Sequence, residues 1–130
     1  MNEERFGGNG DIWVTDGYGS SFIHRYNKTG GYQSSINGSE GSAGHFKCPH
    51  GVMFRHRSGT PELYIADRGN NRLQVYDAEG RFKRVVNDQY FAPCGFVFQG
   101  EYLYMPELCA GVTVLDGNDK IVAQLGTTQR

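Results

Sequence analysis

Short apolar segments separated by polar turns recur along the whole chain. Three of them are related, each running from apolar or aromatic residues to an acid: Ile12-Trp13-Val14-Thr15-Asp16, Leu63-Tyr64-Ile65-Ala66-Asp67 and Leu103-Tyr104-Met105-Pro106-Glu107. Each is followed by a second strand pattern, at 22–26, 72–76 and 111–115, and by a third, at 32–36, 82–86 and 121–125. Alternation of apolar and polar residues within these segments is typical of half-buried β-strands. We therefore predict a repeated antiparallel unit, with no helix longer than about two turns.

Turns and entry segments complete the unit. The second and third strands are joined by turns rich in Asn, Asp and Gly, at 27–30, 77–80 and 116–119. A further strand opens the second and third units, at 52–54 and 96–98, after Pro49-His50-Gly51 and Pro93-Cys94-Gly95. His50 and Cys94 therefore occupy equivalent positions. Residues 1–10 are too glycine-rich and charged to supply this strand to the first unit, which leaves a prediction of eleven strands.

The spacing of the units favours a β-propeller. They begin 51 and 40 residues apart, and the 11 extra residues of the first interval fall in loops. Four short antiparallel strands in about 40 residues are typical of one propeller blade. We predict an all-β fold, a single domain 1–130 with blades at 11–38, 50–88 and 94–126, the first without its innermost strand. A β-sandwich of hairpins is the alternative, but it does not require three units in register.

Composition and charge narrow the class of protein further. The 19 glycines and 17 aromatic residues suit a fold of many turns and a ring-filled core. No segment approaches the ~20 apolar residues of a membrane helix, so we expect no membrane partner. A net charge of -1 argues against nucleic acid as a partner. No signal-peptide pattern is visible, so a cytoplasmic location is the default expectation. Three cysteines without CxxC spacing predict neither a disulfide framework nor a zinc ribbon.

The second unit carries a motif that resembles a known repeat. Residues 66–77, Ala-Asp-Arg-Gly-Asn-Asn-Arg-Leu-Gln-Val-Tyr-Asp, with Gly80 and Phe82 after them, are similar to the signature of NHL repeats. Gly44-His45-Phe46 followed by Pro49 resembles the connection that enters an NHL blade. The likeness covers residues 9–126 and is weaker in the third unit. NHL propellers usually have six blades, so the resemblance implies half of a six-bladed ring.

Within NHL proteins the likeness is closest to peptidyl-α-hydroxyglycine α-amidating lyase, a zinc-dependent enzyme that releases a peptide amide and glyoxylate. The resemblance implies that Tyr18 is a catalytic base, His50 a zinc ligand and Arg68 the catalytic anchor of substrate, all at one end of the tunnel. A metal-bound hydroxyl, a phenolate and a guanidinium suit that chemistry. From the residues alone, each has a structural alternative. Tyr18 is also explained as an aromatic residue packed in its loop, and Arg68 as part of a loop that the neighbouring acid stabilises.

Symmetry argues against a complete lyase site in one chain. The family takes three histidines from alternate blades, whereas here the blade next to that of His50 carries Cys94. A twofold axis does not generate such a triangle, although paired His50 side chains with Cys94 suit a poorer zinc or copper site. The other histidines, His24, His45 and His56, are expected at the surface or in loop packing.

Two functions of different classes follow. The first, which we favour, is a binding module that closes with a second copy as a homodimer, because three blades leave two apolar faces open. Its tunnel mouth would bind a small molecule or peptide with Tyr18, His50, Arg68 and the binding residues Cys94 and Glu107. The second is a zinc-dependent lyase that takes its missing ligands from a partner or a longer parent chain.

Overall fold

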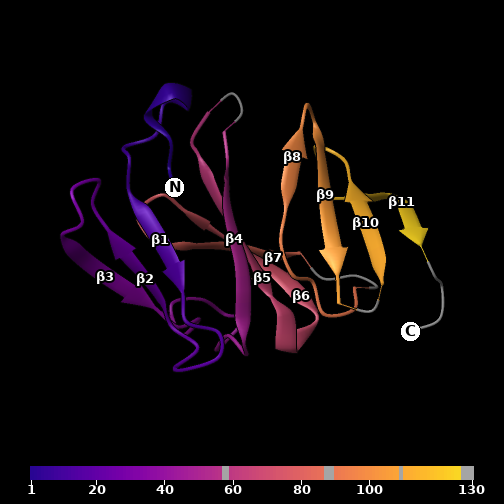
Figure 1. Cartoon of the computed structure of the whole chain (residues 1–130), viewed down its shortest axis with the longest axis horizontal. Helices are drawn as coiled ribbons and strands as arrows, with labels where there is room; N and C mark the ends of the chain where they lie inside the picture. Colours follow the sequence, from indigo (N-terminus) through magenta and orange to yellow (C-terminus); the bar gives the residue numbers. More distant parts are fainter. Residues whose placement is uncertain (57–58, 87–89, 109, 127–130) are drawn as a thin grey trace.

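Three antiparallel sheets make up the molecule (Figure 1), in a computed structural model that describes residues 1–56, 59–86, 90–108 and 110–126. Blade 1 is ordered β1-β2-β3: Ile12–Thr15, Ile23–Tyr26 and Tyr32–Ile36. Blade 2 is ordered β4-β5-β6-β7: Pro49–Arg55, Glu62–Asp67, Arg72–Asp77 and Phe82–Val86. Blade 3 is ordered β8-β9-β10-β11: Val97–Gln99, Tyr102–Glu107, Gly111–Leu115 and Ile121–Gly126. The predicted all-β fold is confirmed, including the absence of an inner strand from blade 1 in the described residues.

Helical structure is confined to two short 3-10 turns in the described part of the chain. The first, η1, spans Glu4–Phe6, and the second, η2, spans Arg68–Asn70 in the loop after β5. No helix in those parts is long and apolar enough to cross a membrane.

Turns held by side-chain hydrogen bonds connect the two outer strands of a blade, as the sequence predicts. In blade 2, Asp77 Oδ1 accepts the backbone N–H groups of Glu79 and Arg81 at 3.0 and 2.8 Å. Asp116 repeats this in blade 3. Gly80 follows with φ of +87°, a left-handed conformation that glycine adopts at little cost. Each turn thus fixes the register of the two strands that it joins.

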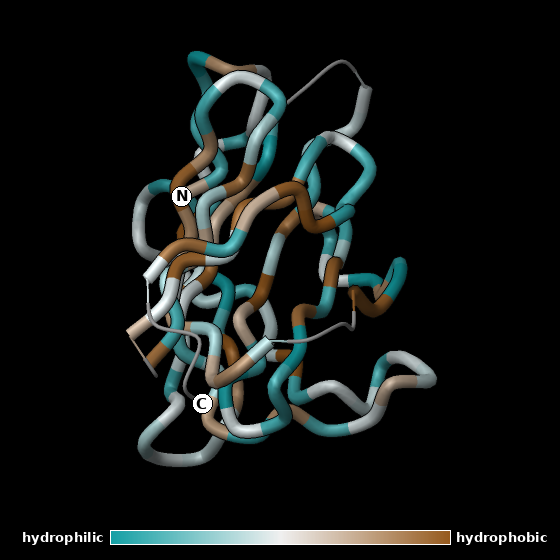
Figure 2. Tube along the Cα trace, turned by 90° about the vertical axis from the view of Figure 1, so that its right-hand side faces the viewer, coloured by the Kyte–Doolittle hydropathy of each residue, from teal (hydrophilic) through white to brown (hydrophobic). Residues whose placement is uncertain are grey.

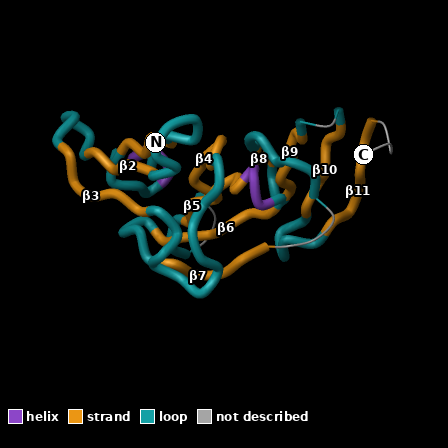
Figure 3. The backbone as a smooth tube through the Cα atoms, turned by 90° about the horizontal axis from the view of Figure 1, so that it is seen from below, coloured by secondary structure: helices purple, strands orange, loops and turns teal. Residues whose placement is uncertain are grey.

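Aromatic contacts between sheets form the core. Trp13 of blade 1 meets Phe54 of blade 2 with ring centroids 6.3 Å apart, and Tyr64 of blade 2 meets Phe98 of blade 3 at 5.4 Å. Trp13 and Tyr64 stand at equivalent repeat positions, so the same contact is made twice. Seen from below, the sheets spread as a fan with β3, β7 and β11 at its rim (Figure 3).

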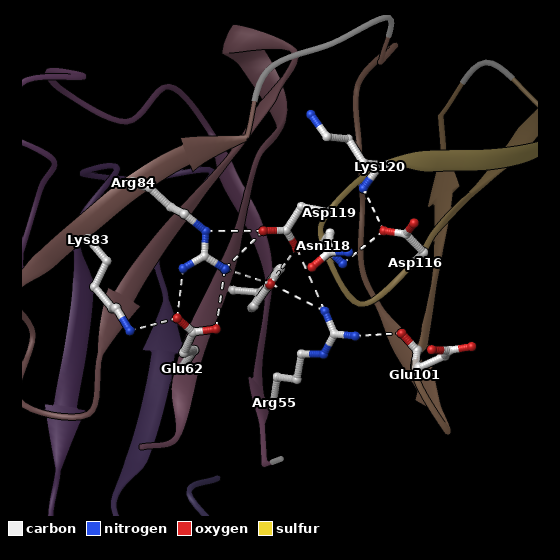
Figure 4. Close-up of polar contacts among 10 residues, drawn as sticks. Arg55, Glu62, Lys83, Arg84, Glu101, Asp116, Asn118, Asp119 and Lys120 are labelled. Carbon is white, nitrogen blue, oxygen red and sulfur yellow. Dashed lines mark hydrogen bonds and ion pairs between the residues drawn. The ribbon is translucent and has the colours of Figure 1, made fainter. Parts of the chain in front are cut away.

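A buried charged network joins blades 2 and 3 at the opposite end from η2 (Figure 4). Glu62 accepts hydrogen bonds from Lys83 and Arg84, both at 2.7 Å. Arg84 also reaches Asp119 at 2.9 Å, and Asp119 lies in the turn between β10 and β11. Arg55 is 3% exposed and donates to the backbone oxygen of Glu101 in blade 3. The network therefore ties two sheets together with charges of opposite sign.

Blades 1 and 3 each present a face without a neighbouring sheet. Leu103 and Met105 of β9 pack toward blade 2, so Tyr104 and Pro106 point the other way. The strand register extends this open face of blade 3 in two rows: Val97-Tyr104-Val114-Ala123 and Pro106-Val112-Leu125. Figure 2 looks onto this side of the molecule. The open face of blade 1 is more mixed, with Ile12, Val14, His24, Tyr26, Tyr32 and Ser35.

Candidate binding site at the entry end

An acid stands at the end of each of three strands: Asp16 after β1, Asp67 in β5 and Glu107 in β9. These acids and the loops beside them lie at one end of the sheets, the lower end in Figure 1. We call this the entry end, formed by residues 16–22, 44–50, 68–71 and 90–96. Pro49 lies opposite Asp67, and Pro93 forms a bridge with Glu107. The predicted equivalence of the two entry tripeptides is therefore present in the strand pairing.

The acids of blades 2 and 3 brace the entry loops. Asp67 is fully buried and accepts the backbone N–H of Lys47 at 2.8 Å. Glu107, 6% exposed, accepts the backbone N–H of Phe91, the counterpart of Lys47, and the hydroxyl of Thr113 at 2.5 Å. The predicted role of Glu107 in ligand binding stays a prediction, and its carboxylate lies within this brace.

Arg68 is the centre of a polar cluster at the entry end. Its Nη1 donates to the hydroxyl of Tyr18 at 3.0 Å, and its Cζ lies 5.0 Å from the centroid of that ring. Its Nη2 lies 2.9 Å from Sγ of Cys48. The hydrogen bond to Tyr18, and then that to Cys48, raise the pKa of Arg68 above its ordinary value despite some burial. The guanidinium therefore stays positively charged.

His50 lies beside this pair with its ring exposed. Its centroid is 6.0 Å from that of Tyr18, and the two rings are perpendicular, at 87°. Its Nδ1 lies 2.8 Å from the backbone oxygen of Cys94. Because a carbonyl oxygen only accepts, Nδ1 carries the proton, and Nε2 of the neutral ring has a lone pair available. His50 therefore offers one good donor atom to a ligand or metal.

Of the residues selected from the sequence, Tyr18, His50 and Arg68 come together. Cys94 touches the group only through its backbone oxygen, because its thiol lies 3.3 Å from the backbone oxygen of Ala92. Sequence reasoning missed Cys48 as a member. The one signal in the sequence was the position of Cys48 directly before Pro49, equivalent to that of Ala92 before Pro93. In the structure both residues have a left-handed φ of +51°.

Zinc requires three or four ligand atoms. His50 supplies one nitrogen, and nowhere in the described ranges do three or more His, Cys, Asp or Glu side chains gather closely enough to hold a metal ion. These residues do not fit a complete zinc site. The role of His50 as a metal ligand stays a prediction.

Comparison with known proteins finds similarity among solved structures. No protein-family model matches the chain, and no curated protein matches it. Among solved structures, a chain in a crystal structure of a nidogen/laminin complex is similar, with a TM-score of 0.67 and 18% sequence identity. The likeness covers 91% of this chain and 43% of that one, so the protein spans less than half of its neighbour. At this identity the comparison shows the fold alone, three β-propeller blades.

Proposed function

We propose that the protein is a self-assembling half-propeller module that binds, at the entry end, a carboxylate carried by a small molecule or a peptide. The observation that carries this proposal is the charge of Arg68. Its two hydrogen-bonding partners are the phenol of Tyr18 and the thiol of Cys48, and neither is a carboxylate. No carboxylate among the described residues forms an ion pair with it.

The surroundings of Arg68 suit an anion on an organic group. A guanidinium binds a carboxylate with two parallel hydrogen bonds, a geometry that lysine does not reproduce. Tyr18, 80% exposed, and the exposed ring of His50 provide an aromatic wall beside the charge. A short peptide with a free terminal carboxylate therefore matches both parts of the site.

The test is a calorimetric titration with two versions of one short peptide, ending either in a glycine carboxylate or in the amide. We expect the carboxylate form to bind at least about tenfold more tightly than the amide, since a charge-assisted pair is lost. Arg68→Gln should remove this preference. Arg81→Gln is the matched control, because Arg81 is 75% exposed and pairs with Asp77 outside the entry end. Equal affinity of both peptides, or an unchanged preference in Arg68→Gln, would contradict the proposal.

Self-assembly is supported by the open faces of blades 1 and 3. Val97 and Leu125 of blade 3 are 57% and 54% exposed, and Tyr32 of blade 1 is 60% exposed. Burying apolar surface gains about 25 cal/mol per Å², and each face has the shape of a blade that lacks its neighbour. We propose a homodimer in which blade 3 of each copy packs on blade 1 of the other. The neighbouring solved structure is itself of a complex between proteins, in line with an interaction module.

A second candidate function is the zinc-dependent lyase. The observation that favours it is the gathering of Tyr18, His50 and Arg68, the three residues that the resemblance to the amidating lyase selects. Elemental analysis of the purified protein and release of glyoxylate from a peptide ending in α-hydroxyglycine would test it. Stoichiometric zinc that is lost in His50→Ala would support this function. Equal zinc affinity of His50→Ala and the parent would refute the role of His50.

A further inference from the structure

Two short motifs in blade 1 combine an asparagine with a hydroxyl residue two positions later. They are Asn27-Lys28-Thr29, in the turn between β2 and β3, and Asn37-Gly38-Ser39, directly after β3. Both have the form Asn-X-Ser/Thr without a proline in the middle, which is the acceptor sequence for N-linked oligosaccharides. The other asparagines of the chain lack it. Because the motif is short, the geometry and accessibility of each asparagine decide whether it can act.

The side chain of Asn27 forms a turn with its own motif. Its Oδ1 accepts the backbone N–H groups of Thr29 and Gly31, at 3.1 and 2.8 Å, and the hydroxyl of Thr29 at 2.8 Å. Within the described residues its Nδ2 donates no hydrogen bond. The carbonyl oxygen is therefore held by the turn, while the amide nitrogen, the atom to which a sugar is attached, stays available.

Asn37 repeats this arrangement at the other motif. Its Oδ1 accepts the backbone N–H of Ser39 at 3.0 Å and the hydroxyl of Ser39 at 2.7 Å. Its Nδ2, like that of Asn27, has no acceptor in the part of the chain that the structure describes. Hydrogen bonds between residues two positions apart form locally. Both turns can therefore form in the nascent chain, before the sheets have assembled.

The equivalent turn of blade 2 indicates that a neighbouring blade does not cover this position. Asp77 Oδ1 accepts backbone N–H groups as Asn27 Oδ1 does, so Asp77 Oδ2 stands in the place of Asn27 Nδ2. This turn lies against blade 1, since a Cβ added to Gly80 would be 3.3 Å from the ring of Trp13. Asp77 Oδ2 nevertheless bonds to Arg81, whose side chain is 75% exposed. The nitrogen of Asn27 is therefore accessible whether or not a further blade packs on blade 1.

The two asparagines lie at opposite ends of β3, the outermost strand of blade 1 (Figure 3). The strand, Tyr-Gln-Ser-Ser-Ile at 32–36, contains neither a charged residue nor a proline, and Tyr32 is 60% exposed. Edge strands usually carry such residues, because their unpaired backbone groups are a template for association with other chains. A bulky hydrophilic oligosaccharide at each end of β3 would cover this edge.

We propose that Asn27 and Asn37 are N-glycosylation sites, each of which accepts an oligosaccharide from a polyprenyl-diphosphate donor with the help of a transferase. A bond forms between Nδ2 and C1 of the first sugar, and the bond between C1 and the diphosphate oxygen breaks. The diphosphate leaves with the electron pair, and Nδ2 gives up one proton. The proposal assigns the chain to a secretory route, in place of the cytoplasmic location expected by default. It rests neither on the carboxylate site nor on self-assembly.

The test is mass spectrometry of the protein purified from the cells that naturally make it, after treatment with peptide N-glycosidase in heavy-oxygen water. The enzyme converts a glycosylated asparagine into an aspartate that carries one heavy oxygen atom. We expect this label at Asn27 and Asn37. Asn9 is the matched control, because it precedes a glycine as Asn37 does and so deamidates spontaneously in the same way, but lacks the hydroxyl residue. A label at Asn9 equal to that at Asn37 would overturn the assignment of Asn37.

Variants of the hydroxyl residues complete the test. The chain is synthesised behind an added secretion signal in a cell-free extract with microsomes, and the parent should show two shifts in gel mobility that peptide N-glycosidase removes. Thr29→Val and Ser39→Ala keep the asparagines but lose a hydroxyl, so each should lose one shift. Thr29→Ser is the matched control and should keep both. A parent without shifts, variants that keep both, or unlabelled asparagines at 27 and 37 in the natural protein would overturn the proposal.

Discussion

At the scale of single residues, Asp67 holds the entry end in place. Its buried carboxylate accepts the N–H of Lys47 and hydrogen bonds from the side chains of Asn70 and Arg72, at 2.8 to 3.0 Å. These donors come from both sides of the cluster around Arg68. A buried charge with this many partners is costly to replace, because each donor loses an acceptor that water does not supply.

We predict that Asp67→Asn lowers the free energy of unfolding by about 3 kcal/mol, since Arg72 is left without its charged partner. Asp77→Asn is the comparison, because its partner Arg81 is 75% exposed and an asparagine keeps the turn. That variant should change stability by about 0.5 kcal/mol or less. Urea denaturation measures both. Similar losses of unfolding free energy in the two variants would show that Asp67 stabilises the fold no more than an exposed acid does.

Much of the candidate site was predictable at this scale, because Tyr18, His50 and Arg68 follow motifs that fix their place in the repeat. The hydrogen bonding of Glu107 was not predictable, because an acid at the end of a strand is equally consistent with ligand binding and with a structural role in the adjacent loop. Its hydrogen bonds to Phe91 and Thr113 depend on a loop and a strand that the local motif does not include.

At the scale of elements, the entry tripeptides set how closely neighbouring blades approach. A Cβ added to Gly51 would lie 2.5 Å from the backbone oxygen of Cys94 and 2.6 Å from the Cα of Gly95. A Cβ on Gly95 itself would meet nothing within 4 Å, because blade 3 has no neighbour on that side. The glycine of the tripeptide is therefore a requirement of blade packing.

Gly51→Ala should accordingly cost about 1–3 kcal/mol of stability through overpacking between β4 and residues 94–95, which precede β8. Gly95→Ala, the same change at the equivalent position, should be nearly neutral in the single chain. Thermal unfolding of the two variants checks this contrast. Equal losses would mean that the contact between Gly51 and blade 3 does not limit their approach.

The charged network between blades 2 and 3 makes stability depend on pH. Burial raises the pKa of Glu62, but hydrogen bonds from Arg84 and Lys83 outweigh it and lower the pKa from 4.5 to about 2. A depressed carboxyl pKa contributes stability above the unfolded value of 4.5, and this contribution is lost as pH falls toward 2.

Glu62→Gln should therefore be less stable than the parent at pH 7, and the difference should shrink steadily between pH 4.5 and 2. Denaturation at a series of pH values measures it. A constant difference over that range would contradict the role of the network.

The sequence predicted the strands well, because Asn, Asp and Gly turns and an alternating pattern mark nearly every hairpin. It did not predict this network. Arg55, Glu62 and Asp119 stand next to turns, where charged residues are usually solvated, and only the packing of blade 2 on blade 3 buries them.

At the scale of the whole molecule, three blades form a fan with unlike ends. The open face of blade 3 is mainly apolar, and that of blade 1 mixes apolar groups with His24 and Ser35, which bond to each other at 2.7 Å. Unlike faces pack head to tail, and a twofold axis closes two such contacts into a ring. The three blades were predictable from the repeat, but the sequence pattern does not determine what covers their open faces.

The most direct test is the mass of the protein in solution by light scattering during size-exclusion chromatography at micromolar concentration. We predict about 29 kDa, a dimer of the 14.5 kDa chain. Val97→Glu, which places a charge on the open face of blade 3, should shift the mass to that of the monomer. Thr29→Glu, in the exposed turn between β2 and β3, should leave the dimer intact. A single monomeric species of 14.5 kDa for the unmodified protein would contradict self-assembly through the open faces.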